Sequence, residues 1–363
     1  MSEAGDDPDV LATLASSYQK LGFALFSHSM VASSGDRAAG DAARKKGLAL
    51  AERALAAKRT HLDANRAWAG ITSDQALTLG FEGKTAEALA LFDAAQDRLR
   101  AALEEQPRHN RLLYDWAYNR QRAANVAITG GQSGQAQIDA AKAVVARWEQ
   151  SEPPPNLRDS THVKGLLLGA EQREATRLKD TPRAIALITE QLRLQSAFGQ
   201  TAPDDTTVQQ QTASSYAALG TAQLLDAKNY AAALDPLRNA LAIYEREFAR
   251  DKTDMRLLSQ IARVRTHLGN TLLGLAKPNE ALPLYAQSVA AWEQSLATDS
   301  RPHLKRQAAE AYWRLATVQQ ASGLKTEAHA SAQKLANFAA KEPATFEKAP
   351  AAAWLAEVNA LLK

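Results

Sequence analysis

The chain has 363 residues, of which 45% are hydrophobic and 23% are charged, and its formal net charge is only +3. This composition is typical of a folded protein and excludes general disorder, and the nearly balanced charge gives no signal for a nucleic-acid or membrane-surface partner. The sequence contains no cysteine, which excludes disulfides, thiolate zinc sites and cysteine nucleophiles.

The sequence shows no signal for insertion into a membrane. No window approaches the roughly 20 apolar residues of a membrane span. Residues 1–9 are acidic and polar, whereas a secretory signal starts with basic residues followed by apolar ones. We therefore expect a soluble chain, either in the cytoplasm or as the extracytoplasmic part of a larger membrane-anchored protein. Repeat-like sequence begins at Asp9, as expected of a fragment of a longer kinase or regulator.

Two helices joined by a tight turn recur along the chain, and the clearest copy is residues 268–289. Here Gly269 on the first helix is followed twelve residues later by Ala281 on the second. Small residues at these two positions allow the helices to pack closely. Aligning other segments on the small residue of the second helix gives seven units spaced by about 48 residues. The aligned residues are Ala42, Ala88, Ala136, Ala184, Ala232, Ala281 and Ala328.

The small residue of the first helix is less regular. Five units have alanine or glycine there, namely Ala76, Ala124, Gly220, Gly269 and Ala316. The fourth unit has Gln172 in this register, and Gly169, three residues earlier, is the alternative counterpart. The register of the fourth unit therefore stays open at this point.

Turn residues and prolines divide the chain into units of about 9–59, 60–106, 107–152, 156–199, 204–250, 252–298 and 302–342. Each unit is predicted to contain two helices of roughly 20 residues, about 30 Å long. No run shows the alternation of apolar and polar residues that is typical of a strand. Residues 349–362 are amphipathic and are predicted to form a helix that caps the end of the stack.

The sequence therefore predicts one all-α domain over residues 1–363. It is expected to be a right-handed superhelical solenoid of about seven antiparallel helix pairs followed by the C-terminal capping helix.

The spacing of Leu268, Gly269, Ala281 and Tyr285 resembles the tetratricopeptide pattern, in which a Leu-Gly pair precedes a small residue and an aromatic one. The period departs from the family, whose repeats have about 34 residues, and no proline ends the second helix. The long period further resembles the repeat regions appended to bacterial Ser/Thr protein kinases and related regulators. That resemblance implies a scaffold or sensor module.

No motif for catalysis, cofactor binding or metal binding stands out. The Gly-rich segment 130–134 lacks the preceding strand and the Lys-Ser or Lys-Thr pair of a phosphate-binding loop. The seven histidines are scattered, and no two lie three or four residues apart as a helical metal site requires. No pair of carboxylates is distinguished as acid and base. We therefore expect no enzyme activity, no cofactor and no metal site.

Charge on the predicted first helices is the remaining functional signal. Residues 107–129 have a net charge of +3 and residues 252–277 of +4, whereas residues 204–227 contain three aspartates and no basic residue. In a tetratricopeptide stack these helices line the concave groove, so the resemblance implies that some of their polar residues bind a peptide. The candidate peptide-binding residues are Arg122, Asn125, Arg263, His267, Asn270 and Arg314.

Asn125 and Asn270 occupy the same repeat position, which resembles the asparagine of a carboxylate-holding clamp. The alternative is that all six candidates are ordinary solvated surface residues. Three functions stay open. The first is a non-enzymatic scaffold or sensor that binds a protein or peptide, acidic or with a free C-terminus. The second is a regulatory domain that binds a small molecule or a cell-wall fragment. The third and most remote is an enzyme whose site is assembled from distant residues.

Overall fold

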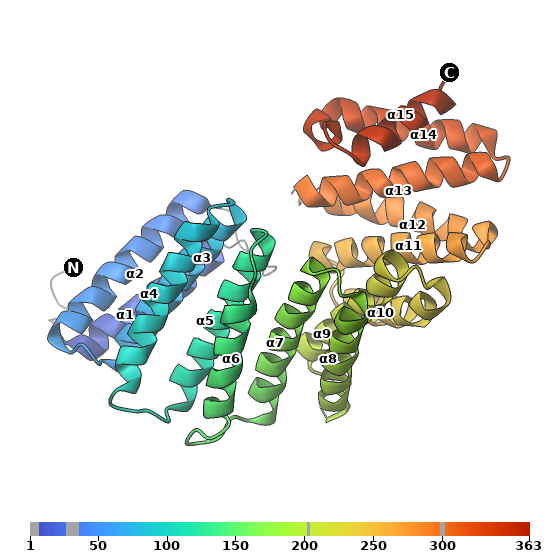
Figure 1. Cartoon of the computed structure of the whole chain (residues 1–363). Coiled ribbons are helices and arrows are strands. Elements are labelled where there is room, and N and C mark those ends of the chain that lie inside the picture. The colour runs from blue at the N-terminus through green and yellow to red at the C-terminus, as the bar shows by residue number, and fades with distance from the viewer. Residues whose placement is uncertain (1–6, 27–35, 202–203, 298–301) are drawn as a thin grey trace. The chain divides into compact units, whose positions relative to one another are not determined.

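The computed structural model describes residues 7–26, 36–201, 204–297 and 302–363, and every regular element within these ranges is a helix (Figure 1). Seven consecutive helix pairs are followed by a last helix in this part of the chain, as the sequence predicts. The helices are α1 (Pro8–Leu25), α2 (Arg37–Ala57), α3 (Leu62–Phe81), α4 (Thr85–Leu103), α5 (Asn110–Thr129), α6 (Gln135–Trp148), α7 (Leu157–Arg177), α8 (Thr181–Thr201), α9 (Thr206–Thr221), α10 (Tyr230–Arg250), α11 (Met255–Gly274), α12 (Pro278–Leu296), α13 (Pro302–Ala321), α14 (Lys325–Lys341) and α15 (Ala351–Leu361). A short π-helix (Ala222–Asp226) follows α9, and a short 3-10 helix (Pro343–Phe346) precedes α15.

The chain divides into two compact units, Met1–Leu194 and Gln195–Lys363, and the division falls within α8. Unit 1 contains α1 to α7 and most of α8, and unit 2 contains the end of α8 and α9 to α15. The sequence predicts a single domain over all residues, and that part of the domain description stays a prediction.

In the six helix pairs from α3–α4 to α13–α14, the turn inside the pair contains one residue in the left-handed backbone region, with φ between 52° and 80°. Glycine tolerates this conformation without strain, but three of the turns use lysine or alanine. These residues are Gly83, Gly131, Lys179, Lys228, Ala276 and Gly323. Their near-constant spacing shows the repeat period directly in the backbone.

Glycine notches let the two helices of a pair approach each other where the sequence predicts. A methyl group on Gly269 would lie 2.6 Å from the ring of Tyr285, and one on Gly220 would lie 2.5 Å from Leu237 Cγ. In the fourth unit Gly169 is buried next to Gln191 of α8, whereas Gln172 is partly exposed and bonds Thr176. Gly169, the alternative counterpart, is therefore the buried residue at this position, although a methyl group there would meet Gln191 only at 3.7 Å.

The alignment of the second helices is wrong in three units. Ala42 and Ala136 are exposed and Ala232 is only partly buried, whereas Ala43, Ile138 and Ala233 are buried. The physical reason is that alanine-rich runs offer adjacent residues of equal size, so size alone does not fix which one faces the neighbouring helix.

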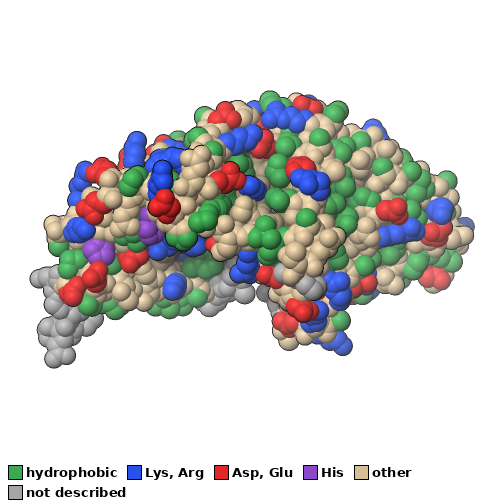
Figure 2. Space-filling model, turned by 90° about the horizontal axis from the view of Figure 1, so that it is seen from below, with side chains coloured by type: hydrophobic (Ala, Val, Ile, Leu, Met, Phe, Trp, Pro, Cys, Tyr) green, Lys and Arg blue, Asp and Glu red, His purple; other side chains and the backbone are tan. Residues whose placement is uncertain are grey.

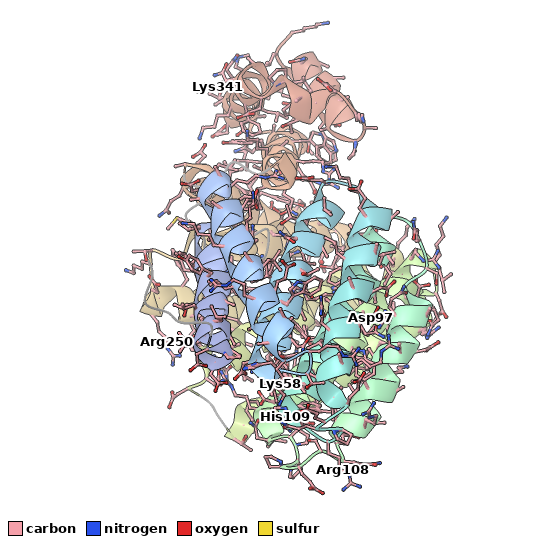
Figure 3. The ribbon with its side chains drawn as sticks, turned by 90° about the vertical axis from the view of Figure 1, so that its left-hand side faces the viewer. Lys58, Asp97, Arg108, His109, Arg250 and Lys341 are labelled. Atoms are coloured by element: carbon pink, nitrogen blue, oxygen red, sulfur yellow. The ribbon has the colours of Figure 1, made fainter. Side chains whose placement is uncertain are left out.

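Polar side chains in equivalent positions of successive repeats pair with each other, at sequence separations of 44 to 49 residues. In unit 1 the pairs are Arg37–Glu82, Lys58–Glu105, Arg59–Glu104, Arg66–Asp115, Ser73–Asn119, Asp74–Arg122, Arg108–Glu152 and Asn125–Arg173. In unit 2 they are Gln210–Arg256 and Thr221–His267. Figure 3 shows Lys58, Arg108 and His109 at one end of the helices of unit 1.

Two histidines have structural roles that also follow the repeat. His61 and His109 lie just before α3 and α5, and the Nδ1 atom of each accepts a hydrogen bond of 3.3 Å from a backbone amide of the first turn. Free amides at a helix start need such acceptors. These two side chains are therefore used to begin helices.

The predicted capping helix is present as α15, which packs on α13 and α14. Val358 is fully buried, and the ring of Trp354 stacks on that of Trp313 with 5.3 Å between the ring centres. The Trp313 indole N–H donates to Glu357, also on α15. Apolar burial and these ring contacts explain why an amphipathic segment closes this end of unit 2.

Candidate functional site

The six candidate residues lie in both units. Arg122 and Asn125 lie on α5 in unit 1, whereas the other four lie in unit 2. We call these four, Arg263, His267 and Asn270 on α11 with Arg314 on α13, the unit 2 polar cluster. Their assignment as peptide-binding residues stays a prediction.

In unit 1, the guanidinium of Arg122 forms an ion pair with Asp74 of α3. The Arg122 Nη2 to Asp74 Oδ1 distance is 2.7 Å, and the two side chains are only 12% and 10% exposed. The guanidinium also lies over the ring of Tyr118, 5.5 Å from its centre. Asn125 Oδ1 accepts a hydrogen bond of 3.0 Å from Arg173 Nε. A ligand carboxylate that bound Arg122 would therefore compete with Asp74.

A pocket of about 640 Å³ lies beside Arg122, lined by side chains from α1, α3, α4, α5 and α7. We call it the unit 1 pocket. Tyr114 and Tyr118 stack in it at 6.2 Å, and Arg111 lies 4.3 Å from the centre of the Tyr114 ring. Burial raises the pKa of Tyr114 to about 12 and lowers the pKa of His162, so both side chains are neutral at pH 7.

In the unit 2 polar cluster, Arg263 has no carboxylate partner among the described residues. Its Nη2 donates to Gln260 Oε1 of the same helix, and its buried Nε has no partner in the described part of the chain. His267 lies one turn further along α11, and its Nδ1 lies 3.0 Å from Thr221 Oγ1. Burial lowers the pKa of His267 to about 4, with a further contribution from the charge of Arg263. The imidazole is therefore neutral at pH 7.

The Tyr285 hydroxyl bonds Asn270, and the charges of Arg314 and Glu310 act on it. The hydroxyl donates to Asn270 Oδ1 at 2.7 Å, and Asn270 Nδ2 donates to Glu310 Oε1 at 3.2 Å. Burial raises the pKa of Tyr285, while the positive charge of Arg314 acts in the opposite direction. Arg314 stacks on Trp313 at 4.1 Å, and no ion pair with a described carboxylate holds it.

This arrangement can bind charged and hydrogen-bonding groups, and the described residues form no group of three His, Asp or Glu side chains that could hold a metal ion. Lys, Arg, Asp and Glu side chains are interspersed over the face shown in Figure 2 and do not gather by sign. A charged ligand would therefore be bound by individual side chains and not by a broad patch of one sign. An arginine that already forms an ion pair with a carboxylate of this chain is less able to bind such a ligand.

A model of the tetratricopeptide repeat family matches residues 212–251 and 261–301, which cover most of α9 to α12. Two segments of the chain therefore match the tetratricopeptide repeat, and the described helices form a helical-repeat fold similar to that of this family. The predicted resemblance is thereby confirmed, while the link to kinase-appended regions stays a prediction. None of the curated proteins compared with the chain matches it.

Solved structures share this tetratricopeptide-like fold at low sequence identity. The apo form of RapI aligns with a TM-score of 0.62 and 11% identity over 98% of this chain and 81% of its own. BtubC from P. vanneervenii aligns with a TM-score of 0.52 and 14% identity over 72% of this chain and 92% of its own. Nro1 of S. pombe, described as a hypoxic regulator of sterol synthesis and a nuclear import adaptor, gives 0.52 and 11% over 86% and 99%. At these identities the likeness concerns the fold alone.

Sequence reasoning missed the partners that the tetratricopeptide-like repeat brings to the candidate residues. Asp74 lies 48 residues before Arg122, and Thr221 lies 46 residues before His267. An acidic or hydroxyl residue one period away from a candidate is the signal that could have revealed them.

No helix of the described residues is long and apolar enough to cross a membrane.

Proposed function

We propose that the chain is a non-enzymatic module that binds a protein or peptide, and that the unit 2 polar cluster holds a carboxylate of this partner. The observation that carries the proposal is that Arg263 and Arg314 have no carboxylate partner among the described residues. A guanidinium with free donors binds a carboxylate through charge-assisted hydrogen bonds. The neutral His267 and Asn270 add polar groups, although Asn270 also donates to the carboxylate of Glu310 at 3.2 Å.

Arg122 and Asn125 support the proposal less well, because each already has a partner within unit 1. The charge of Arg122 is already matched by Asp74, so this arginine supports the packing of α3 against α5. The carboxylate of a partner is better served by arginines that have no internal competitor. Arg263 and Arg314 are therefore the residues that carry the proposed recognition.

The setting we propose is a scaffold or sensor module of a bacterial signalling system, associated with a Ser/Thr kinase. Its support is the resemblance of the long-period repeats to the repeat regions appended to such kinases. Detection of a kinase reading frame directly upstream of the gene would support it, and an unrelated neighbourhood would count against it.

The carboxylate proposal is tested by fluorescence anisotropy with pools of labelled short peptides that have a free C-terminus. We expect Arg263→Glu or Arg314→Glu to weaken binding by about 10-fold or more, because truncating or reversing a desolvated charge contact costs about 2 kcal/mol or more. Peptides with an amidated C-terminus should bind the unaltered chain correspondingly less tightly.

Arg306→Glu is the matched control, since Arg306 lies exposed on the same helix as Arg314. It makes the same change of charge away from the cluster and should leave affinity nearly unchanged. Equal loss in Arg306→Glu and Arg314→Glu, or equal binding of free and amidated peptides, would remove the carboxylate proposal.

A further inference from the structure

We propose that the exposed face of α1 is an interface with a second copy of this chain, in which the α1 helices of the two copies pack antiparallel. The proposal goes beyond the carboxylate proposal, because α1 lies in unit 1 and contains none of the six candidate residues. The interface is a line of mostly apolar residues on α1, which we call the α1 stripe. The α1 stripe consists of Val10, Leu14, Ser17, Leu21 and Ala24, all of which are exposed.

The α1 stripe concentrates exposed apolar side chains on one helix. Among the described residues eight large apolar side chains are exposed, and three of them, Val10, Leu14 and Leu21, lie in this line at 37–46% exposure. The other five lie singly at helix ends or next to turns, namely Phe81, Leu157, Leu178, Leu225 and Leu324. Single exposed apolar residues are normal on a protein surface, whereas a contiguous set of them marks an interface.

The spacing within the α1 stripe suits a second helix. Steps of four, three, four and three residues keep one line on a helix, and two helices pack side by side along such a line. The other face of α1 is already part of the core of unit 1, where Leu11, Ala12 and Ala15 are buried. The helices α2 and α3 pack on that face, and no helix of the described residues covers the α1 stripe.

The α1 stripe also differs from the exposed face of α15, which covers α13 and α14 in unit 2. The exposed residues of the segment that begins with α15 are small or polar, namely Ala353, Ala356, Glu357, Asn359, Ala360 and Lys363. Such a face lets a repeat array end in water. Figure 1 shows α1 and α2 at one edge of unit 1, and the apolar α1 stripe lies at this edge without such a cover.

Side-chain sizes along the α1 stripe match a second copy in antiparallel orientation. When Leu14 of each copy faces Ser17 of the other, a large side chain meets a small one at the centre of the pair. The same register places Val10 of each copy against Leu21 of the other at both ends. A parallel pair would place Ser17 against Ser17 and leave a gap at the centre, and close packing disfavours such a gap.

Charges beside the α1 stripe favour the same orientation. Asp9 and Lys20 are both exposed, and they lie on the same side of α1 because eleven residues span about three helical turns. A two-fold axis brings this side of both helices together, so Asp9 of each copy lies beside Lys20 of the other. Asp9 is 91% exposed, although it contacts His61 Nε2 at 2.9 Å. This self-complementary charge distinguishes a second copy from an arbitrary apolar helix.

The oligomeric state of the full chain tests the proposal. Sedimentation velocity from about 10 µM to about 1 mM should show a reversible equilibrium of monomer and dimer, because a small interface is weak. Leu14→Glu places two carboxylates at the centre of the pair and should raise the dimer dissociation constant about 10-fold or more. Leu178→Glu is the matched control, since it changes another exposed leucine of unit 1 and should leave the equilibrium unchanged.

Exchange of the flanking charges tests the antiparallel orientation. Asp9→Lys and Lys20→Glu should each raise the dimer dissociation constant by about 3–10-fold, because like charges then meet at both ends of the pair. Combining the two substitutions in one chain restores opposite charges and should recover most of the loss. Additive losses in the combined variant would overturn this orientation.

Disulfide cross-linking tests the register, because the sequence contains no cysteine and each introduced thiol is the only one in its chain. A mixture of the Leu14→Cys and Ser17→Cys variants should form the mixed disulfide under mild oxidation, faster than either variant forms a disulfide with itself. Faster self-linking of the Ser17→Cys variant would assign a parallel pair and overturn the antiparallel one.

Two results would overturn the assignment of the α1 stripe to a second copy. One is a monomer at every concentration, and the other is a dimer that Leu14→Glu and Leu178→Glu leave equally intact. Circular dichroism of each variant verifies that it is folded. Arg263→Glu should leave the dimer unchanged, so failure of this proposal is distinguishable from failure of the carboxylate proposal.

Discussion

The first-helix faces of the two units differ in how their arginines are neutralised. In unit 1, Arg66 and Arg122 each hold an aspartate about one period away, at 2.7 Å. In unit 2, Arg263 and Arg314 lie on equivalent helices without a carboxylate partner among the described residues. His267 contacts the preceding repeat through Thr221, and Asn270 contacts the following repeat through Glu310. The same repeat therefore uses an arginine for internal packing in one unit and leaves it available in the other.

The largest expected effect comes from reversing one arginine in each unit. Arg122→Glu places a carboxylate against the nearly buried Asp74, and we expect it to lower the free energy of unfolding of unit 1 by about 3 kcal/mol. Arg263→Glu faces no carboxylate among the described residues and should lower the free energy of unfolding of unit 2 by less than Arg122→Glu lowers that of unit 1. A denaturant titration in which the amide hydrogen exchange of each unit is followed measures the change in the free energy of unfolding of unit 1 and of unit 2.

The swap Asp74→Arg with Arg122→Glu is the control, because it restores opposite charges at the two positions. It should recover most of the loss caused by Arg122→Glu. Equal destabilisation by Arg122→Glu and Arg263→Glu would contradict the distinction between a paired and an unpaired face.

The second expected effect is a loss of unit 1 stability in acid through Glu174, which is 1% exposed as a residue. Hydrogen bonds from Arg177, and then from Ser133 and the Gly134 amide, lower its pKa from 4.5 to about 2. Its contribution is complete above pH 4.5 and is lost as the pH falls toward 2, because the unfolded state then binds the proton more tightly. The loss should be about 2–3 kcal/mol.

Glu174→Gln should remove this pH dependence while lowering stability at pH 7. Thermal unfolding across the acid range, compared between the two proteins, measures the effect. A parallel pH profile of both proteins would show that Glu174 does not link α7 to the start of α6 through its charge.

The third expected effect compares the glycine notches of the two units. Gly269→Ala in unit 2 would place a methyl group 2.6 Å from the Tyr285 ring, and overpacking of this kind costs about 1–3 kcal/mol. Gly169→Ala in unit 1 would meet Gln191 only at 3.7 Å, so the better helix propensity of alanine should stabilise unit 1 by about 0.5–1 kcal/mol. We expect the two substitutions to change the free energy of unfolding, measured with denaturant, in opposite directions. Changes in the same direction would mean that the two glycine positions are equivalent.

The smallest expected effect is a pH dependence of the stability of unit 2 between pH 6.5 and pH 4. The pKa of His267 falls from 6.5 to about 4 on folding, mainly through burial. Its contribution to stability is complete above pH 6.5 and decreases as the pH falls toward 4, because protonation favours the unfolded state. We expect about 1 kcal/mol, since the side chain is partly exposed and solvent screens its charge. His267→Gln should abolish that dependence in hydrogen exchange of α11.

Much of the fold follows from local patterns. The sequence predicted the helix starts, the turn residues and the approximate repeat period correctly. Helix capping, left-handed turns and amphipathic spacing each depend on residues only a few positions apart. The register of the second helices was wrong at Ala42, Ala136 and Ala232, because neighbouring residues of similar size compete for the buried position. The fourth first helix similarly needed the structure to choose Gly169 over Gln172.

The sequence by itself determined an all-helical repeat with small residues at the close contacts and arginines on the first helices. Only the tertiary structure decided which of these arginines are neutralised. Asp74 reaches Arg122, and Asp115 reaches Arg66, because stacking brings residues one period apart within hydrogen-bond distance. The strength of a charge pair depends on the distance between the two groups in space and falls off over a few ångströms. The sequence shows only their distance along the chain.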